Sequence, residues 1–239
     1  MYKRVLLKLS GESLKGQSEM ILDAHFVDDI AKMITSLSKK GYELAIVIGA
    51  GNIFRGKIAK DIGIERVPAD YMGMMGTVIN AIALSNALKK YDVQSVVTSA
   101  LPAIEDVTVD YNPNEAKIAL EEGKVVFLAG GTGEPFFTTD TAATMRAIEL
   151  DCEAILMGKN GVEGVFTDDP RVNKNAKFIK DITYDEILEK KLSVMDKTAV
   201  ELIQDKNIDI CVFSMTDLNN FERVINGEDI GTTCHRKGK

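Results

Sequence analysis

Short apolar runs alternate with longer segments of helical periodicity along nearly the whole chain. The apolar runs predict buried strands at residues 5–9, 44–48, 93–99, 125–129, 154–157 and 210–213. The periodic segments predict helices at residues 24–40, 69–90, 141–150, 184–190, 195–205 and 217–224. This alternation predicts a largely parallel sheet covered by helices on both faces, which is a three-layer α/β/α sandwich.

The segment 24–40 shows how these helices are recognised. Its apolar residues recur at helical spacing and would form one face: Phe26, Val27, Ile30, Met33, Ile34 and Leu37. Asp23 is suited to cap its start, and Gly41 is suited to end it.

The length of 239 residues suits one domain, and no Pro- or Ser-rich linker, repeat or low-complexity segment divides it. We expect a single domain over residues 1–239, with one lobe near residues 1–150 and a second from about residue 151 onwards. In parallel sheets, ligands bind at the carboxyl ends of the strands. The glycine-rich loops considered below all follow predicted strands.

Charge narrows the candidate ligands. The chain has 29 Lys and Arg against 36 Asp and Glu, a formal net charge of −7. A phosphate ligand must therefore be held by local groups, and broad binding of nucleic acid is not expected. No apolar run approaches the length of a membrane span, and Lys8 interrupts the apolar start of the chain. Neither membrane insertion nor a signal peptide is expected.

Cysteine and histidine add little chemistry. Cys152, Cys211 and Cys234 are far apart and form no CxxC pair, so a zinc site is not expected and the first two are interpreted as core residues. Three free thiols fit a reducing cytoplasm, where we expect the protein to reside. His25 and His235 have no evident metal or nucleophile partner, which argues against histidine catalysis.

The most informative segment runs from Gly130 to Asp140, between an apolar run and a helical one. Its three glycines expose backbone N–H groups, its threonines add hydroxyls, and two phenylalanines supply an apolar wall. A strand that leads through such a loop into a helix N-terminus forms an anion site. The apolar wall indicates that the anion carries a flat ring. The segment therefore predicts a site for a nucleotide or nucleoside phosphate.

Lys8 lies inside an otherwise apolar strand and is followed by Ser10-Gly11-Glu12. A buried ammonium is unfavourable unless it meets an anion, and a phosphate that bridges two nucleotides would be suitable. A lysine that snorkels at a strand end would give the same pattern. Asp140 either caps the helix that follows or orients catalytic lysines and waters. A carboxylate beside transferring phosphates needs a cation nearby.

The segment from Gly49 to Ile58 nearly matches two phosphate-binding patterns and satisfies neither. Phe54 occupies the third glycine of GxGxxG, and Ile58 replaces the hydroxyl that should follow GxxxxGK. What remains is a glycine loop that presents Arg55, whose guanidinium suits phosphate. A plain turn with a solvated arginine is the alternative.

Two further segments complete the candidates. Asp70 lies at a predicted helix start, where it would either cap the helix or accept hydrogen bonds from ribose hydroxyls. Residues 158–170 follow a strand, and their glycines permit close approach to a ring that Phe166 could flank. The run Asp168-Asp169-Pro170 is also typical of a simple turn. A third glycine-rich loop at the end of a strand favours a site for two nucleotides.

Taken together, these segments resemble bacterial uridylate (UMP) kinases of the amino-acid-kinase superfamily, from Tyr2 to about Thr233. The motifs that carry the resemblance are YKRVLLKLSGE, VIGAGNIFRG, DYMGMMGT, AGGTGEPFFTTDTAA, VEGVFTDDP and LSVMD. Each is modest alone, but their order and spacing are specific. The resemblance implies phosphoryl transfer from Mg²⁺–ATP to UMP, which gives ADP and UDP.

The resemblance also implies roles for individual residues, matched by position. Those implied to carry or organise catalysis are Lys8, Arg55, Asp140 and Asp196. Those implied to bind ATP are Lys8, Leu9, Ser10, Gly11, Gly51, Arg55, Asn160, Phe166 and Asp169. Those implied to bind UMP are Ala50, Asp70, Thr132, Gly133, Glu134, Pro135, Phe136, Phe137, Thr138 and Thr139. No protein ligand of the magnesium ion is implied.

The family is typically homohexameric and inhibited by UTP, and the resemblance implies both for this chain. Its members often carry glycines between the first strand and the first helix, in a segment associated with regulation by GTP. Here residues 16–23 contain only Gly16. This segment departs from the family pattern, so the resemblance does not imply activation by GTP.

Two other functions stay open from the sequence. Another kinase of the superfamily would act on carbamate, a glutamate derivative or aspartate, and the GTGEPFFTTD loop counts against it. A nucleotide-binding sensor or storage protein would carry out no chemistry. The presence of Lys8, Arg55 and Asp140 argues against that function.

Overall fold

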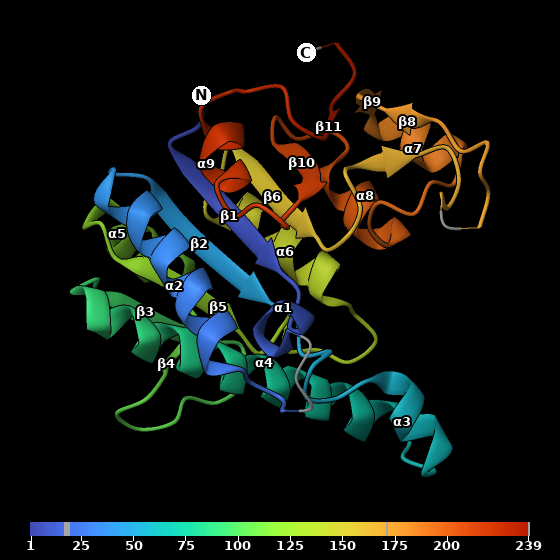
Figure 1. Cartoon of the computed structure of the whole chain (residues 1–239). Coiled ribbons are helices and arrows are strands. Elements are labelled where there is room, and N and C mark those ends of the chain that lie inside the picture. Colours follow the sequence, from blue (N-terminus) through green and yellow to red (C-terminus); the bar gives the residue numbers. More distant parts are fainter. Residues whose placement is uncertain (17–19, 171, 239) are drawn as a thin grey trace.

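A nine-stranded sheet forms the centre of the computed structural model, which describes residues 1–16, 20–170 and 172–238 (Figure 1). The strand order is β4-β3-β5-β2-β1-β6-β10-β11-β9. Neighbouring strands are parallel except for β10 and β11, which run antiparallel. The strands are β1 (Arg4–Leu9), β2 (Glu43–Ile48), β3 (Ser95–Ser99), β4 (Val109–Asp110), β5 (Val125–Ala129), β6 (Ala154–Lys159), β9 (Asp181–Thr183), β10 (Asp209–Ser214) and β11 (Thr232–His235).

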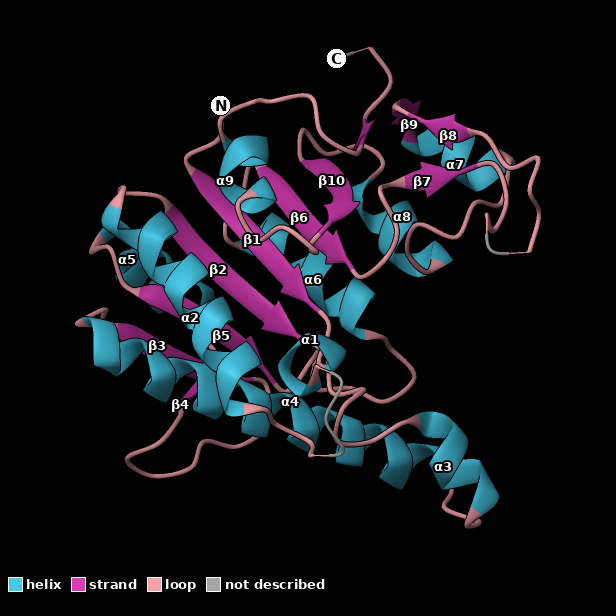
Figure 2. Cartoon of the chain, in the orientation of Figure 1, coloured by secondary structure: helices cyan, strands magenta, loops and turns pink. Residues whose placement is uncertain are grey.

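Helices cover both faces of this sheet, which confirms the expected three-layer α/β/α sandwich (Figure 2). One face carries α2 (Ala24–Lys39), α4 (Arg66–Leu88) and α9 (Asn220–Ile225). The other carries α5 (Pro113–Glu121), α6 (Thr139–Glu149), α7 (Tyr184–Glu189) and α8 (Lys197–Ile203). The short α1 (Glu12–Lys15) and α3 (Gly56–Asp61) lie outside these layers, and β7 (Val165–Phe166) pairs with β8 (Phe178–Ile179) in a separate hairpin.

The central strand β1 shows why the sheet is buried on both faces. Val5, Leu7 and Leu9 belong to the core beneath α2 and α4, whereas Leu6 belongs to the core beneath α6. Side chains alternate between the faces of a strand, so Lys8 shares the face of Leu6. A near-continuous apolar strand is typical of a parallel sheet covered by helices. A lysine within such a strand requires an interaction that compensates its charge.

Most of the expected elements are confirmed. Asp23 caps α2 by accepting hydrogen bonds from the backbone N–H groups of His25 and Phe26, and Gly41 follows the helix with φ of 86°. Cys152 and Cys211 are buried, as expected of core residues. None of the helices in the described ranges is long and apolar enough to cross a membrane.

Two expected helix starts are wrong. The helix expected at 69–90 begins at Arg66, so Asp70 lies within it and does not cap it. Pro68 lies in the first turn of this helix, where proline is tolerated because no backbone N–H is needed. Within a helix proline is unfavourable, so the sequence pattern placed the start after it. The helix expected at 141–150 begins at Thr139, and the Thr138 hydroxyl accepts from the N–H groups of Asp140 and Thr141. Thr138 therefore caps this helix, and Asp140 is free for another contact.

The periodic pattern missed three α-helices, α1, α3 and α5. The segments of α1 and α3 have only four and six residues, too few for an apolar repeat to predict them. The helix α5 had a signal in the sequence, because Asn112 caps it and Pro113 occupies its first position. For α5, the local capping residues carry more information than hydrophobic spacing.

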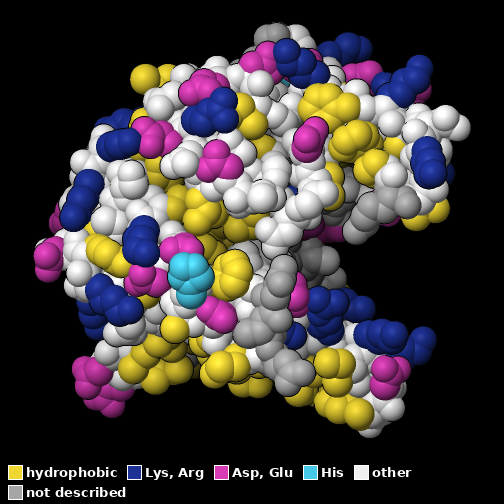
Figure 3. Space-filling view, viewed as in Figure 1, with side chains coloured by type: hydrophobic (Ala, Val, Ile, Leu, Met, Phe, Trp, Pro, Cys, Tyr) yellow, Lys and Arg dark blue, Asp and Glu magenta, His cyan; other side chains and the backbone are white. Residues whose placement is uncertain are grey.

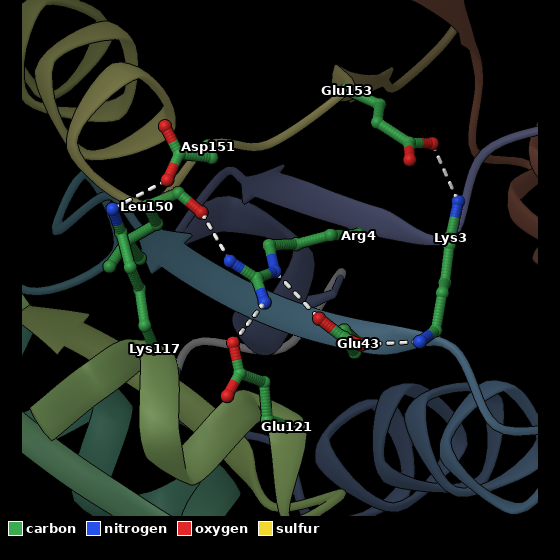
Figure 4. Close-up of polar contacts among 8 residues, drawn as sticks. All are labelled: Lys3, Arg4, Glu43, Lys117, Glu121, Leu150, Asp151 and Glu153. Atoms are coloured by element: carbon green, nitrogen blue, oxygen red, sulfur yellow. Dashed lines mark hydrogen bonds and ion pairs between the residues drawn. The ribbon is translucent and has the colours of Figure 1, made fainter. Parts of the chain in front are cut away.

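An ion cluster fixes the start of β1 at the edge of the core opposite the glycine loops (Figure 4). Arg4 Nε lies 2.6 Å from Glu43 Oε2, and Lys3 Nζ lies 2.9 Å from Glu43 Oε1. Arg4 also donates to the carbonyl oxygen of Leu150 over 2.8 Å. Burial by itself raises the pKa of Glu43. The hydrogen bonds from Lys3 and Arg4 lower it by more than burial raises it, so the net pKa lies below its ordinary value.

We expect Glu43→Gln to lower the free energy of unfolding by about 1–3 kcal/mol at pH 7, because it breaks charge-assisted bonds in a buried position. A carboxylate with a lowered pKa stabilises the fold above its unfolded pKa, about 4.3 for glutamate, and this contribution is lost as the pH falls through the folded value. Urea denaturation at pH 7 and pH 4 measures both effects.

The control for this prediction is Glu121→Gln, since the Glu121 side chain is 63% exposed and pairs with the same arginine. We expect it to change the unfolding free energy by less than about 1 kcal/mol. Equal unfolding midpoints for the Glu43 variant and the unmodified chain at pH 7 would contradict the role given to the cluster.

Candidate active site

The centre of the site is an ion pair at the carboxyl ends of the strands. Lys8 Nζ lies 2.6 Å from Asp140 Oδ1, and the two side chains are only 19% and 22% exposed. Lys8 comes from β1, and Asp140 comes from the first turn of α6, whose positive dipole end favours a carboxylate. The buried ammonium predicted from the sequence thus has an internal anion as its partner.

The start of α6 is held in place by Asp196. This residue caps α8 by accepting from the N–H of Ala199, and it also accepts from the hydroxyls of Thr138 and Thr141. Asp196 therefore joins the first turns of α6 and α8. It organises the helix that carries Asp140 without lining the cavities described below.

The loop after β1 lies directly against the loop after β2. A Cβ atom on Gly11 would lie 2.2 Å from Asn52 Oδ1 and 2.5 Å from the carbonyl oxygen of Gly49, so only glycine permits this approach. The side-chain amides of Asn52 and Asn80 bond to each other, and Asn80 Nδ2 donates to the Gly49 carbonyl over 2.8 Å. This amide pair fixes the loop after β2 to α4.

Arg55 bridges the same two loops on their exposed side. Its Nη2 lies 2.7 Å from Glu12 Oε1, and its Nε donates to the carbonyl oxygen of Gly51 over 3.1 Å. The arginine side chain is 61% exposed, so the pair with Glu12 is accessible to an anionic ligand. The Leu9 carbonyl accepts from the N–H of Gly49, and the Ser10 carbonyl accepts from the N–H and hydroxyl of Ser13, so both oxygens are engaged within the protein.

A first cavity, of about 190 Å³, lies between the glycine-rich loop after β5 and α4. It brings together seven residues predicted to bind UMP: Ala50, Asp70, Thr132, Glu134, Phe137, Thr138 and Thr139. Gly51 also lines it. Gly133, Pro135 and Phe136 lie in the same loop but do not line the cavity, and Phe136 is 65% exposed. We call this the acceptor cavity.

Asp70 joins Arg66 and Phe136 at the rim of the acceptor cavity. Its Oδ2 accepts from the backbone N–H of Phe136 over 2.8 Å, and Arg66 Nε lies 2.8 Å from each carboxylate oxygen. Phe136 adopts φ of 73°, a left-handed conformation that is strained for an aromatic residue. Asp70 therefore stabilises an unusual backbone conformation at the edge of the cavity.

The beginning of the same loop is held from two sides. Gly130 donates its N–H to the hydroxyl of Thr77 in α4 over 2.8 Å. The buried Arg146 of α6 donates to the carbonyl oxygen of Gly131, and its guanidinium lies 3.8 Å from the centre of the Tyr111 ring. The loop is thus fixed to both helical layers before any ligand is bound.

A second cavity, of about 760 Å³, lies beside β6 and the β7–β8 hairpin. It brings together Asn160, Phe166 and Asp169, the three residues predicted to contact the base and ribose of ATP. We call it the nucleoside cavity. The segment 191–193 lines this cavity and also a neighbouring one, of about 480 Å³, that reaches Asp140. The cavity that reaches Asp140 and the nucleoside cavity therefore adjoin at this segment.

Figure 3 shows a deep hollow between the lobe that carries α7 and α8 and the arm that carries α3. Lys and Arg side chains gather on the α3 arm at the margin of this hollow. The chain has a net negative charge, so this local basic margin matches the expectation that an anionic ligand is held by local groups.

Three residues in this region were not predicted from the sequence. Lys159 ends β6 on the same face as Lys8, Arg66 holds Asp70, and Arg146 holds the acceptor loop. Only Lys159 had a usable signal, because a second lysine follows an apolar strand in the same way as Lys8. Of the segment 16–23, examined for a GTP-associated pattern, residues 17–19 lie outside the described residues.

Relatives of known function match nearly the whole chain. The uridylate kinase of Mycoplasma capricolum subsp. capricolum is 51% identical over 225 residues, which cover 94% of this chain and 94% of that protein. The uridylate kinase of Mesoplasma florum is 49% identical over 227 residues, which cover 95% of this chain and 94% of that protein.

Solved structures give the same result at the level of the fold. The UMP kinase of Bacillus anthracis superposes with a TM-score of 0.95 at 39% identity, covering 99% of this chain and 97% of that one. The UMP kinase of Ureaplasma parvum gives 0.92 at 40% identity, covering 99% and 100%. The model of the amino acid kinase family matches residues 3–214. On the strength of the fold, the loops and these matches, the chain belongs to the amino acid kinase family.

Proposed function

We propose that this chain transfers the γ-phosphoryl group of ATP to UMP, giving ADP and UDP, and so acts in the biosynthesis of pyrimidine nucleotides. The position of the Lys8–Asp140 pair carries the proposal. Thr139, the residue before Asp140, lines the acceptor cavity. Asp140 itself lines the cavity that adjoins the nucleoside cavity. Uridylate kinase relatives that match the chain over its length support UMP as the acceptor.

The mechanism is direct in-line transfer without a covalent intermediate on the protein. Negative charge spreads over the equatorial oxygens of the moving phosphoryl group, so catalysis depends on positioning and on cations. Lys8 would stabilise this charge, and Asp140 would orient the ammonium. The backbone N–H groups of Gly11 and Gly51 would donate to phosphate oxygens. Arg55 would exchange Glu12 for a nucleotide phosphate, which its planar guanidinium can bind with two bonds.

The remaining residues divide between the two nucleotides. On the ATP side, the phosphate contacts would be Lys8, Leu9, Ser10, Gly11, Gly51 and Arg55, and the adenosine contacts would be Asn160, Phe166 and Asp169. On the UMP side, Asp70 would accept from the ribose, Ala50 would contribute its backbone, and the loop 132–139 would surround the base. The Thr138 hydroxyl caps α6, which leaves Thr139 and the backbone of this segment for the uracil.

Magnesium enters this proposal as part of the substrate, Mg²⁺–ATP. No group of three or more His, Cys, Asp and Glu side chains among the described residues is placed to hold a metal. Phosphate oxygens and water are the ligands that Mg²⁺ prefers in such complexes. The ion would neutralise part of the phosphate charge, and the protein would contribute Lys8 and Arg55 beside it.

We also propose that the chain forms a homohexamer, as the family resemblance implies. Four apolar side chains, Val67, Tyr71, Met75 and Ile79, repeat every fourth residue along α4 and are 41%, 38%, 51% and 46% exposed. We call them the α4 stripe. Exposed apolar stripes of this kind mark protein interfaces, and soluble oligomers are mostly built from identical chains. Hydrophobic side chains gather along the lower edge of Figure 3, where α3 and α4 lie.

Three further features complete the proposal. The chain is a single domain, with an acceptor-side lobe near residues 1–150 and an ATP-side lobe near residues 151–239. UTP, which shares its uridine moiety with UMP, is a feedback inhibitor. The location is cytoplasmic, in agreement with three free and buried cysteines.

The experiment that tests the function is a coupled assay of ADP release with ATP and one of three acceptors: UMP, CMP or carbamate. We expect rapid release with UMP and rejection of CMP by a large factor, because a pocket built to pair polar edges leaves groups unpaired with the wrong base. Release with carbamate instead would indicate another kinase of the family. No release with any acceptor, despite nucleotide binding, would indicate a sensor or storage protein.

Lys8→Ala should lower kcat by about a hundredfold or more, since it removes a preorganised cation from the transition state. Steady-state kinetics with UMP and ATP measure the loss, and the melting temperature shows that the variant is folded. Lys39→Ala, an exposed lysine at the end of α2, is the control and should be fully active. Near-normal turnover of a folded Lys8→Ala protein would refute the role of this residue.

Met75→Glu should break the oligomer, because it places a charge in the centre of the α4 stripe. Sedimentation velocity would show a shift from the hexamer to smaller species. Leu202→Glu is the matched control, since Leu202 is a 40% exposed apolar residue on α8, away from the stripe. A Met75→Glu protein that sediments like the unmodified chain would exclude the stripe from the interface.

A further inference from the structure

A second lysine lies on the same face of the sheet as Lys8. In the parallel pair of β1 and β6, Lys8 is in register with Met157. Lys159 follows two residues later, and side chains two apart share a face of the strand. Lys8 and Lys159 therefore both extend from the carboxyl ends of neighbouring strands toward the layer of α6 and α8.

Lys159 is half-buried and has little to compensate its charge. Its Nζ donates to the carbonyl oxygen of Val194 over 3.2 Å. None of the ion pairs recorded among the described residues includes it. Burial is the largest influence on the pKa of Lys159 and lowers it. The charge of Asp140 raises this pKa and the charge of Lys8 lowers it, and the net pKa lies below its ordinary value. An ammonium has three N–H donors, so a carbonyl alone leaves most of its capacity for another acceptor.

The place of Lys159 in the cavities indicates which acceptor fits. It lines the nucleoside cavity together with Asn160, Phe166 and Asp169. The charges of Asp140 and Lys8, the ion pair at the proposed point of transfer, also act on the pKa of Lys159. A chain of phosphates that joins a nucleoside in this cavity to the point of transfer must pass Lys159.

We propose that Lys159 is a catalytic residue that binds the polyphosphate chain of ATP, between the adenosine contacts and Lys8. This inference rests on the proposed function for the identity of the donor nucleotide. The ammonium bonds to the carbonyl oxygen of Val194, a residue that lines the neighbouring cavity that reaches Asp140. Bound phosphate oxygens supply the negative charge that the half-buried ammonium lacks, and they relieve its repulsion from Lys8.

Lys159→Met tests this proposal, because methionine keeps an apolar stem of similar length and removes the charge. The probes are ADP, the β,γ-imido analogue of ATP and adenosine, with affinities measured by calorimetry or by competition. We expect the affinity for both phosphorylated probes to fall by about tenfold or more, as for the loss of a charge-assisted bond, while adenosine binds as before. The KM for UMP should stay unchanged.

Two further variants distinguish a ligand contact from a structural role. Lys159→Arg keeps the charge and should retain most of the affinity for ADP. Lys180→Met removes a lysine that is 64% exposed and pairs with Asp229, away from the cavities, and it should bind all three probes normally. Because Lys159→Met removes a poorly compensated charge, its melting temperature without nucleotide should not fall.

The outcomes separate the proposal from its alternatives. Unchanged affinity for ADP in Lys159→Met would overturn it. An equal loss of affinity for adenosine, a lowered melting temperature, or failure of both Lys159→Met and Lys159→Gln to fold would assign the residue to the fold and overturn it as well. The proposed function would fail if the unmodified chain released no ADP with UMP. The affinities for ADP, the imido analogue and adenosine are measured without UMP, so they test the role of Lys159 separately.

Discussion

The contact between the Lys8 ammonium and the Asp140 carboxylate is the constraint on which the rest of the site depends. A charged group in the central strand of a sheet covered on both faces destabilises the fold unless an opposite charge meets it. That charge comes from the first turn of α6, so electrostatics fixes where this helix starts relative to β1. Asp196 then fixes α8 to the same turn. The result is an ammonium held at the carboxyl end of the central strand β1, with its counter-charge already in place.

Backbone packing, together with the local charges of Lys8 and Arg55, supports the proposed phosphate site. The loops after β1 and β2 touch where Gly11 meets Gly49 and Asn52, and this contact leaves no room for a side chain. Asn80 holds the second loop from α4, so the geometry is supported by a buried amide pair and not by exposed charges. Such support explains how a chain of net charge −7 can present an anion site.

The two cavities proposed to bind the nucleotides differ in how the protein holds them. The acceptor loop is fixed by Thr77, Asp70 and Arg146 from both helical layers, and one of its residues, Phe136, has a strained backbone. The nucleoside cavity is larger and is bounded by the β7–β8 hairpin and the segment 190–193, which lie outside the main sheet. A tightly held acceptor cavity suits discrimination between bases, because misplaced polar groups cannot adjust. The larger donor cavity suits a nucleotide that is recognised mainly through its phosphates.

The sequence by itself determined the alternation of strands and helices, the three-layer fold and the grouping of glycine loops at the strand ends, because each depends on local periodicity and on residues that tolerate unusual turns. It also singled out Lys8, since a charge in an apolar strand is visible without a structure. It could not show that Thr138 rather than Asp140 caps α6, that Asp70 is held by Arg66, or that Lys159 lies beside Lys8. The first two are local contacts, which were missed because the starts of α4 and α6 were expected too late in the chain. The third depends on which strands become neighbours, and strand order in a parallel sheet is set by packing between segments far apart in the chain, which no local pattern records.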